Sequence, residues 1–210
     1  MNNKKYISKL RSFFYHDIKD LKNIKILEFG VREGNSTNFF LELCDQNNGK
    51  LYSVDINNCS HLFKNEKWKF IHSSDDDFKK VINESEKEFD LIFIDSFHDP
   101  DHVKKLIFNY FNFLKKNGIM IIDDISWLPY SKNNYRDHFH TEIINRDTFA
   151  EILNVLSNNK QSMEVFFSFN DSGLAKIIKR SDEPLKYGKN LINRSFSLKN
   201  IIKKILKKVK

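Results

Sequence analysis

The chain has 210 residues, of which 40% are hydrophobic, and this is enough apolar material for the core of one domain. Its formal net charge of +7 lies in residues 194–210, which hold seven lysines and arginines and no acid, so residues 1–193 are neutral as a whole. A neutral body argues against a broad nucleic-acid-binding surface, and two cysteines without metal or redox spacing argue against a disulfide framework.

Apolar periodicity divides most of the chain into short strands and helices. In chain order it predicts a helix at 6–21, a strand at 24–29, a helix at 36–46, strands at 50–55 and 68–72, a helix at about 76–87, a strand at 89–95, a helix at 100–115, a strand at 119–123, a helix at 147–158, and strands at 162–169 and 173–179. Residues 125–146 show no clear period, so we expect a long loop there, with Trp127, Tyr130 and His138 as candidate substrate contacts. Residues 171–173 supply the turn of a closing hairpin.

The run from Leu91 to Ile94 is apolar at every position, which is typical of a strand covered on both faces of a parallel sheet. Strand–helix alternation that ends in a hairpin therefore predicts an α/β fold. Its sheet is doubly wound, mostly parallel and seven-stranded, with a terminal antiparallel hairpin strand. We divide the chain into an N-terminal helical segment at 1–22, a central domain at 23–180 and a basic amphipathic tail at 181–210.

Polar residues gather where the predicted strands end. Ligands of doubly wound sheets bind at this edge. A single acid at a strand end often only caps the following helix, but here acids recur at successive strand ends, so the set points to a ligand site. Its members are Glu28, Asp55, Asp75, Asp95, Asp123 and Asp124, together with His98.

The first of these strand ends leads into a loop bounded by Gly30 and Gly34, which permit a positive φ or a close approach of a ligand to the backbone. Arg32 stands where the dinucleotide fingerprint has its middle glycine, so a pyrophosphate could not sit as close. Asp55, at the end of the next strand, can accept hydrogen bonds from both hydroxyls of a ribose. The pattern therefore predicts a bound nucleoside and disfavours a dinucleotide.

These motifs resemble class I S-adenosylmethionine-dependent methyltransferases over residues 24–180. The residues that carry the resemblance are the run from Ile26 to Gly34, Asp55, Ser74, Asp75, Asp95 and the terminal hairpin. The runs 89–98 and 118–124 are similar to the branch of catechol-type and sugar O-methyltransferases. The resemblance implies a Rossmann-like methyltransferase fold, the cofactor S-adenosylmethionine, and a hydroxyl of a small molecule or saccharide as the methyl acceptor.

The resemblance also implies roles for individual residues. Cofactor binding falls to Glu28, Gly30, Gly34, Ser36, Asp55, Ser74, Asp75 and Asp95. Members of that branch often hold a divalent cation such as Mg²⁺ after the fourth and fifth strands, and the matching positions are Asp95, Asp123 and Asp124. The catalytic residues would be Asp95 and His98, with His98 as the general base. Pro100 stands where the sugar-modifying relatives tend to have a tyrosine.

Other functions stay open at this point. A metal-independent or N-directed methyltransferase would use the same acids only to orient its substrate. A nucleotide-binding module without catalysis is disfavoured by the acids and His98, and a nicotinamide-dependent enzyme by the two-glycine loop. Structural zinc through His98 and His102, or through His138 and His140, is disfavoured because no cysteine ligand lies nearby, and we expect His102 on a helix surface.

The tail has Leu198, Ile202, Ile205 and Val209 on one helical face and lysines on the other. A basic amphipathic helix is typical of a segment that binds an anionic membrane surface, and an ordinary solvated or docked helix is the alternative. No apolar run reaches the roughly 18 residues of a membrane span, and no secretory signal is visible. The sequence thus predicts a cytoplasmic protein with a peripheral contact at the inner membrane surface, no specific nucleic-acid partner, and room for a homo-oligomer.

Overall fold

The computed structural model describes residues 3–126, 139–192 and 197–208. The strands are β1 (Lys25–Phe29), β2 (Lys50–Asp55), β3 (Trp68–His72), β4 (Phe89–Ile94), β5 (Leu114–Asp123), β6 (Met163–Ser168) and β7 (Leu174–Lys179). The helices are α1 (Asn3–Leu10), α2 (His16–Ile18), α3 (Asn35–Asn47), α4 (Phe78–Glu84), α5 (Pro100–Tyr110), α6 (Phe139–Asn158) and α7 (Leu198–Lys208). A π-helical turn η1 (Arg11–Tyr15) joins α1 to α2, and a 3-10 turn η2 (Phe111–Phe113) follows α5.

All seven strands belong to one sheet in the order β3-β2-β1-β4-β5-β7-β6. Strands β1 to β5 pair in parallel, whereas β7 is antiparallel to its neighbours β5 and β6. The predicted mostly parallel seven-stranded sheet with its antiparallel hairpin strand is confirmed. The strand order reverses between β1 and β4, and in doubly wound sheets the crevice that binds ligands opens at such a reversal.

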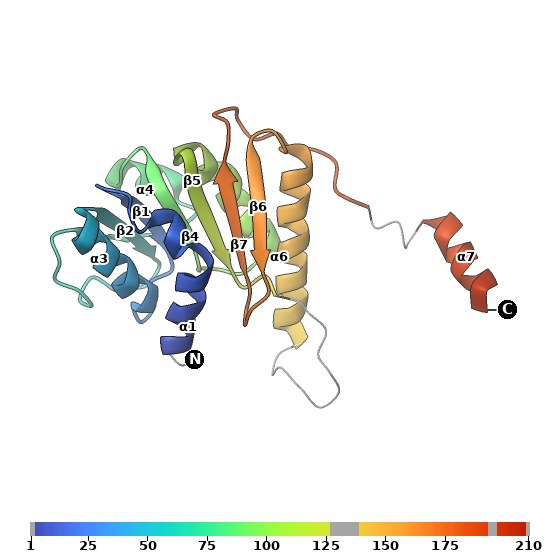
Figure 1. The fold of residues 1–210 in the computed structure, drawn as a ribbon, viewed down its shortest axis with the longest axis horizontal. Coiled ribbons are helices and arrows are strands. Elements are labelled where there is room, and N and C mark those ends of the chain that lie inside the picture. The colour runs from blue at the N-terminus through green and yellow to red at the C-terminus, as the bar shows by residue number, and fades with distance from the viewer. Residues whose placement is uncertain (1–2, 127–138, 193–196, 209–210) are drawn as a thin grey trace.

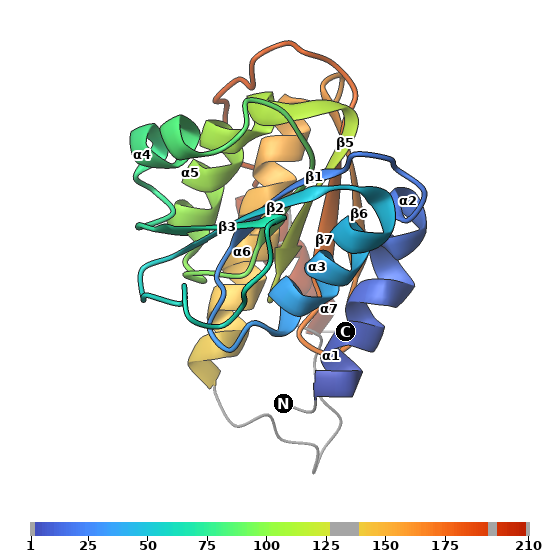
Figure 2. The ribbon, with the colours of Figure 1, turned by 90° about the vertical axis from the view of Figure 1, so that its left-hand side faces the viewer.

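Helices cover both faces of the sheet (Figures 1 and 2). On one face the N-terminal helices and α3 pack through fully buried rings such as Phe14 of η1 and Phe40 of α3, which lie 6.5 and 5.3 Å from the ring of Phe93 in β4. On the other face α4, α5 and α6 bury residues such as Ile107 and Ile152. The N-terminal segment, which the sequence set apart at 1–22, therefore shares the core of the central sheet.

Two predicted boundaries are wrong in the second half of the sheet. The helix predicted to reach residue 115 ends at Tyr110, and β5 begins at Leu114, so the Asn117–Gly118 pair lies inside a strand and does not stop a helix. Asn117 takes a φ of +65°, and the pairing with β4 shifts register beside Phe89, which lets the strand continue past this irregularity.

The long loop is also shorter than predicted. Helix α6 begins at Phe139, so the stretch from 139 to 146 is helical, and Asn145 is buried there with its side-chain amide donating to the carbonyl oxygen of Ser126 (3.3 Å). The periodicity of apolar residues in the sequence does not reveal this tertiary contact. The candidate substrate contacts Trp127, Tyr130 and His138 lie outside the described residues.

Helix α7 stands apart from the sheet at the C-terminal end of the chain (Figure 1). Among the residues that the structure describes, no helix is both long and apolar enough to cross a bilayer.

Candidate active site

Gly30 lies at the reversal point of the sheet, directly after β1. Its φ is +92°, and a Cβ at this position would lie 2.0 Å from the carbonyl oxygen of Asp95, the residue that follows β4. Any other residue would collide with that backbone, because the clash involves a peptide group and no movable side chain. Gly30 therefore allows the loops after β1 and β4 to meet at the floor of the crevice.

Asp55 closes β2 and holds the loop after β1 in place. Its Oδ2 accepts hydrogen bonds from the backbone nitrogens of Val31 (2.8 Å) and Arg32 (3.1 Å), and its Oδ1 accepts one from Asn57 (2.8 Å). Burial on its own would raise the pKa of Asp55, but these backbone donors outweigh burial and lower the pKa. The carboxylate is thus ionised near neutral pH, and Oδ1 keeps room for one more hydrogen bond.

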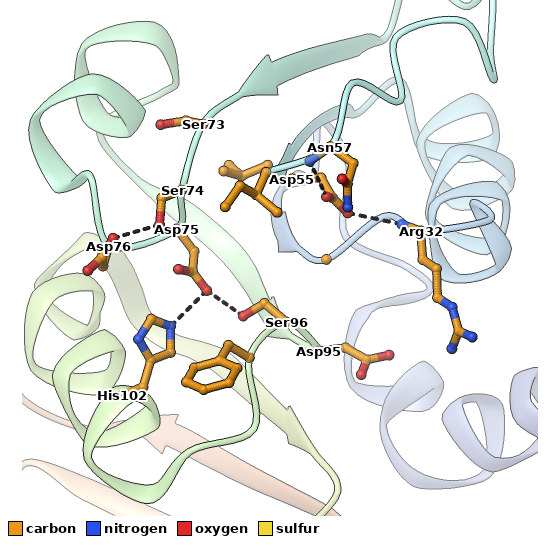
Figure 3. Close-up of a pocket in the computed structure, with 14 residues that line it drawn as sticks. Arg32, Asp55, Asn57, Ser73, Ser74, Asp75, Asp76, Asp95, Ser96 and His102 are labelled. Atoms are coloured by element: carbon orange, nitrogen blue, oxygen red, sulfur yellow. Dashed lines mark hydrogen bonds and ion pairs between the residues drawn. The ribbon is translucent and has the colours of Figure 1, made fainter.

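A pocket of about 510 Å³ opens beside Asp55. Figure 3 shows Asp55 and Asn57 on one side of it and Asp75 on the other. Two exposed apolar side chains, Ile56 and Phe97, also line the pocket. The pocket therefore combines an anionic acceptor with apolar walls, which suits a ligand with a flat ring and a sugar.

The far side of this pocket is organised around Asp75. Its Oδ2 accepts hydrogen bonds from the Ser96 hydroxyl and pairs with the Nε2 atom of His102 at 3.0 Å (Figure 3). The expectation that His102 lies on a helix surface is wrong, because the first turn of α5 directs its ring at Asp75. The signal available in the sequence was an aspartate directly before the first helical residue, Pro100. Asp99 caps α5 by accepting a hydrogen bond from the His102 backbone nitrogen (2.9 Å), and this cap fixes where the helix begins and so which way His102 points.

A second pocket of about 430 Å³ adjoins the first and shares part of its wall, including Gly30, Arg32, Asp95 and Ser96. All of the predicted catalytic and metal-binding residues line it. They are Asp95, His98, Asp123 and Asp124, together with Ser36 from the start of α3. The two pockets thus form one bipartite site, with a nucleoside-sized chamber leading into an acidic chamber.

His98 lies between two carboxylates in the acidic chamber. Its Nε2 atom is 3.2 Å from Asp95 Oδ1 and 3.3 Å from Asp124 Oδ2. Burial on its own would lower the pKa of His98, because it disfavours the charged imidazolium. The contact with Asp95 and the charge of Asp124 outweigh burial and raise the pKa of His98 above its usual 6.5. The arrangement orients the imidazole and stabilises its protonated form, which are the two properties that a general base needs when it accepts a proton.

The N-terminal helix supplies two residues that the sequence did not assign to the site. The Tyr6 hydroxyl donates to Asp95 Oδ2 at 2.7 Å, and Lys9 Nζ contacts both oxygens of Asp123 at 2.6 and 2.9 Å. Lys9 also donates to the Ser172 hydroxyl (2.7 Å) in the hairpin turn. Their spacing of three residues places them on one face of α1, and a lysine among apolar core positions was the available signal.

Asp123, which the sequence predicts as a metal ligand, is paired with Lys9 in the structure. Both Asp123 and Lys9 are buried, and both Asp123 oxygens are bound to the lysine. Burial and the neighbouring charge of Asp95 raise the pKa of Asp123, while Lys9 opposes that rise. The residues that the structure brings together are Asp95, His98 and Asp124, whose ligand atoms all lie within 4.8 Å of one another.

Glu28 is fully buried behind the site, in the middle of the sheet. It accepts hydrogen bonds from three hydroxyls, those of Ser36 (2.6 Å), Thr37 (2.8 Å) and Ser53 (2.6 Å). It thereby ties β1 to β2 and to the start of α3, and it reaches the second pocket only through Ser36. Gly34 caps α3 at a φ of +76°, where a Cβ would press on the ring of Phe63 at 2.6 Å.

The burial of Glu28 is expected to make the stability of the protein depend on pH. Burial raises the pKa of Glu28 from 4.5 to about 7, although the three hydroxyl donors oppose the rise. The folded protein then holds this proton more tightly than the unfolded chain, so the stabilisation is full below pH 4.5 and is lost as the pH rises to 7. We expect the free energy of unfolding of Glu28→Gln, relative to wild type, to increase by about 3 kcal/mol over this range, at about 1.4 kcal/mol per pKa unit.

Urea unfolding at a series of pH values measures this difference. The exposed residue Glu66 provides the matched control, since Glu66→Gln removes the same charge at the surface. A stability difference between Glu28→Gln and wild type that stays constant with pH would contradict the buried, proton-holding role of Glu28.

A comparison with families of known proteins gives a match for the central part of the chain. Residues 27–125 match the family model of a methyltransferase domain. The central part of the chain resembles a methyltransferase domain. The matched stretch runs from β1 to the end of β5 and so includes Gly30, Asp55, Asp95 and Asp124. No curated protein sequence matches the chain.

Solved structures share the architecture of this chain at low sequence identity. MycE, a methyltransferase from the mycinamycin biosynthetic pathway solved with Mg and SAH (S-adenosylhomocysteine), superposes with a TM-score of 0.64 and 16% identity over 85% of this chain and 50% of that one. SAH-bound PaMTH1 of Podospora anserina gives 0.62 and 19% over 75% and 72% of the two chains. A candidate caffeoyl-CoA O-methyltransferase of Staphylococcus aureus gives 0.61 and 18% over 83% and 82%.

These likenesses establish the fold, which is that of S-adenosylmethionine-dependent methyltransferases. The chain spans about half the length of MycE, so MycE has a large part with no counterpart in it. Helix α1 lies outside the matched stretch, and it brings Tyr6 and Lys9 to the site.

Proposed function

We propose that the protein transfers a methyl group from S-adenosylmethionine to a hydroxyl of a small molecule or saccharide, with His98 as the general base. The observation that carries the proposal is the position of His98 between Asp95 and Asp124, in an acidic chamber that opens from the nucleoside-sized chamber. SAH in the structures of MycE and PaMTH1, and O-methylation in the name of the Staphylococcus aureus protein, support the same reaction.

The nucleoside-sized chamber would hold the adenosine of the cofactor. Asp55 Oδ1 has capacity left for one ribose hydroxyl, so a single hydrogen bond replaces the bidentate contact expected from the sequence. Ile56 and Phe97 would enclose the adenine, with Ser74 and Asp75 at its polar edge. Gly30 admits the cofactor close to the backbone between the two chambers, and Ser36 would meet its methionine end.

S-adenosylmethionine supplies an electrophilic methyl group on a positively charged sulfur. In the acidic chamber Nε2 of His98 donates to the carboxylates, so Nδ1 of the same ring would accept the hydroxyl proton of the acceptor while the hydroxyl oxygen forms its bond to the methyl carbon and the carbon–sulfur bond breaks. Asp95 and Asp124 stabilise the imidazolium that results, because both carboxylates are within 3.3 Å of Nε2. Tyr6 holds Asp95 in this orientation through its hydroxyl, and the walls of the chamber position the acceptor for in-line transfer.

A divalent cation fits the same residues. Asp95, His98 and Asp124 would hold it, since their ligand atoms converge, whereas Asp123 is already bound to Lys9. Such a cation would lower the pKa of an acceptor hydroxyl, as metals do for water. The Mg in the MycE structure supports this arrangement for the present chain.

Removal of divalent cations distinguishes a reaction that needs a bound cation from one in which His98 acts as the base without a metal. If a cation is required, exhaustive treatment with a chelator abolishes methyl transfer and added Mg²⁺ restores it. If His98 acts without a metal, transfer is unchanged in the chelator. SAH binding is expected to change little in both cases, because two of the three cation ligands, His98 and Asp124, line only the acidic chamber.

The reaction itself is tested by measuring SAH formation from S-adenosylmethionine with a panel of sugars, nucleotide sugars and catechols. Isothermal titration with SAH is the necessary companion measurement. Failure of the protein to bind either SAH or S-adenosylmethionine would overturn the proposal. Binding without transfer to any hydroxyl, but with transfer to an amine, would move the proposal to an N-directed enzyme, and binding without any transfer would favour a non-catalytic nucleotide-binding module.

Replacement of Asp55 by asparagine tests the cofactor chamber. We expect Asp55→Asn to weaken SAH binding by about 10- to 100-fold, because hydrogen bonds to a charged acceptor are worth about 1.5–3 kcal/mol and the loop after β1 loses its anchor. Asp20→Asn, on an exposed turn far from the chamber, is the control with the same change of charge. Equal SAH affinity for the Asp55 variant and wild type would exclude Asp55 from the cofactor site.

A further inference from the structure

Helix α7 is amphipathic, and its apolar side is open to solvent. Leu198, Ile202, Ile205 and Leu206 have exposed fractions between 54% and 80%. At 100° per residue these positions fall on one side of the helix, and the sequence of α7 contains five lysines and no acid. An uncovered apolar stripe next to dense positive charge is an unfavourable surface in water, so the helix has the properties of a binding segment.

The polypeptide leading to α7 is fixed to the central domain as far as residue 191. Asn154 accepts a hydrogen bond from the backbone of Leu191 (2.8 Å), and Asn159 accepts one from the backbone of Lys186 (2.7 Å). The ring of Tyr187 stacks on Phe108 of α5, with the centroids 3.8 Å apart. Six residues, 192–197, separate this docked segment from α7, and six extended residues span at most about 20 Å.

We infer that α7 docks the protein on an anionic lipid surface, with its apolar side in the interface and its lysines at the headgroups. The charge of the helix selects this partner over two others. A second copy of α7 would cover the apolar stripe but would place lysine beside lysine. A nucleic acid would neutralise the lysines but leave the apolar stripe in water. A membrane with acidic headgroups satisfies both sides of the helix.

The docking does not depend on the proposed chemistry, because none of the α7 side chains that the structure describes lines either pocket. It would keep the active site within a short tether of the membrane. The contact would be peripheral, since the amphipathic pattern supports a helix that lies in the interface plane.

Co-sedimentation of the full chain with vesicles tests the inference. We expect binding to vesicles of phosphatidylcholine mixed with phosphatidylglycerol, little binding to phosphatidylcholine alone, and a decrease in binding with salt. Replacing both Ile202 and Ile205 by glutamate removes the apolar side and is expected to abolish binding. Replacing both Lys199 and Lys203 by glutamate is expected to weaken it by about 25-fold or more, at about fivefold for each lysine removed.

The matched control replaces the exposed lysines Lys64 and Lys79 of the domain by glutamate, which changes the net charge by the same amount as the Lys199 and Lys203 pair. This control is expected to bind vesicles like wild type. SAH binding should be equal in all variants, which shows that each is folded.

Three results would overturn the inference. The first is equal binding to neutral and anionic vesicles, and the second is a loss in the control as large as in the tail variant. The third is a different partner for α7: a dimer in sedimentation velocity that the Ile202 and Ile205 variant dissolves would show that a second copy covers the stripe, and binding of a DNA duplex in place of vesicles would show a nucleic-acid partner.

Discussion

Replacing His98 by glutamine is expected to lower kcat for methyl transfer by about 10²- to 10⁴-fold, the usual contribution of a positioned general base. Glutamine keeps a polar side chain between Asp95 and Asp124 but cannot accept the proton. SAH affinity should be unchanged, because His98 lines the acidic chamber and not the nucleoside-sized one. The measurement is steady-state kinetics with an acceptor that wild type methylates, together with titration of SAH.

The pH profile makes this prediction more specific. A base must be unprotonated to act, and Asp95 and Asp124 raise the pKa of His98, so kcat/KM of wild type is expected to increase with pH through a value above 6.5. The variant should lose this acidic limb. His16→Gln, on the exposed surface of α2, is the control. A variant with normal kcat, or with the same acidic limb as wild type, would exclude His98 as the base.

Replacing Lys9 by methionine is expected to destabilise the fold by about 3–5 kcal/mol, the usual result of leaving one member of a buried ion pair without its partner. Methionine preserves the apolar stem of the lysine but leaves Asp123 buried without its closest cation. The loss should be smaller at acid pH, where Asp123 can take up a proton and become neutral. Urea unfolding at neutral and acid pH provides the measurement.

The same helix contains a matched control for this prediction. Lys5 pairs with Asp171 at 3.1 Å, but the Lys5 side chain is 69% exposed, so Lys5→Met should cost less than about 1 kcal/mol. The double variant Lys9→Met with Asp123→Asn removes both charges and should recover part of the stability lost in Lys9→Met. Equal unfolding free energies for Lys9→Met and Lys5→Met would show that the Lys9 pair does not stabilise the protein.

Local patterns were sufficient for most of the sheet. Most of the parallel strands are short apolar runs that end at an acid or a glycine, and both faces of the sheet are covered, so Leu91 to Ile94 could be assigned without tertiary information. The errors lie where local signals conflict with packing. Asn117 and Gly118 have the composition of a helix stop, but the register shift against β4 accommodates them within β5.

The site was predictable to the extent that it depends on strand ends. Asp55, Asp75, Asp95 and Asp124 reach the crevice because parallel strands deliver their carboxyl ends to one edge. Which atoms each acid meets was not predictable. Asp123 and Asp124 are neighbours in the chain, yet one is buried against Lys9 and the other faces His98, since Asp124 takes a φ of +58° and turns the backbone between them.

The amino-acid sequence by itself determined the order of strands and helices, the glycine-bounded loop after the first strand, and the charged amphipathic tail, because these depend on residues close together in the chain. Only the tertiary structure decided that α1 belongs to the active site, that His102 supports Asp75, and that Asp123 is occupied by Lys9. Those contacts join residues from 27 to 114 positions apart, and their geometry exists only when the sheet and its covering helices have packed.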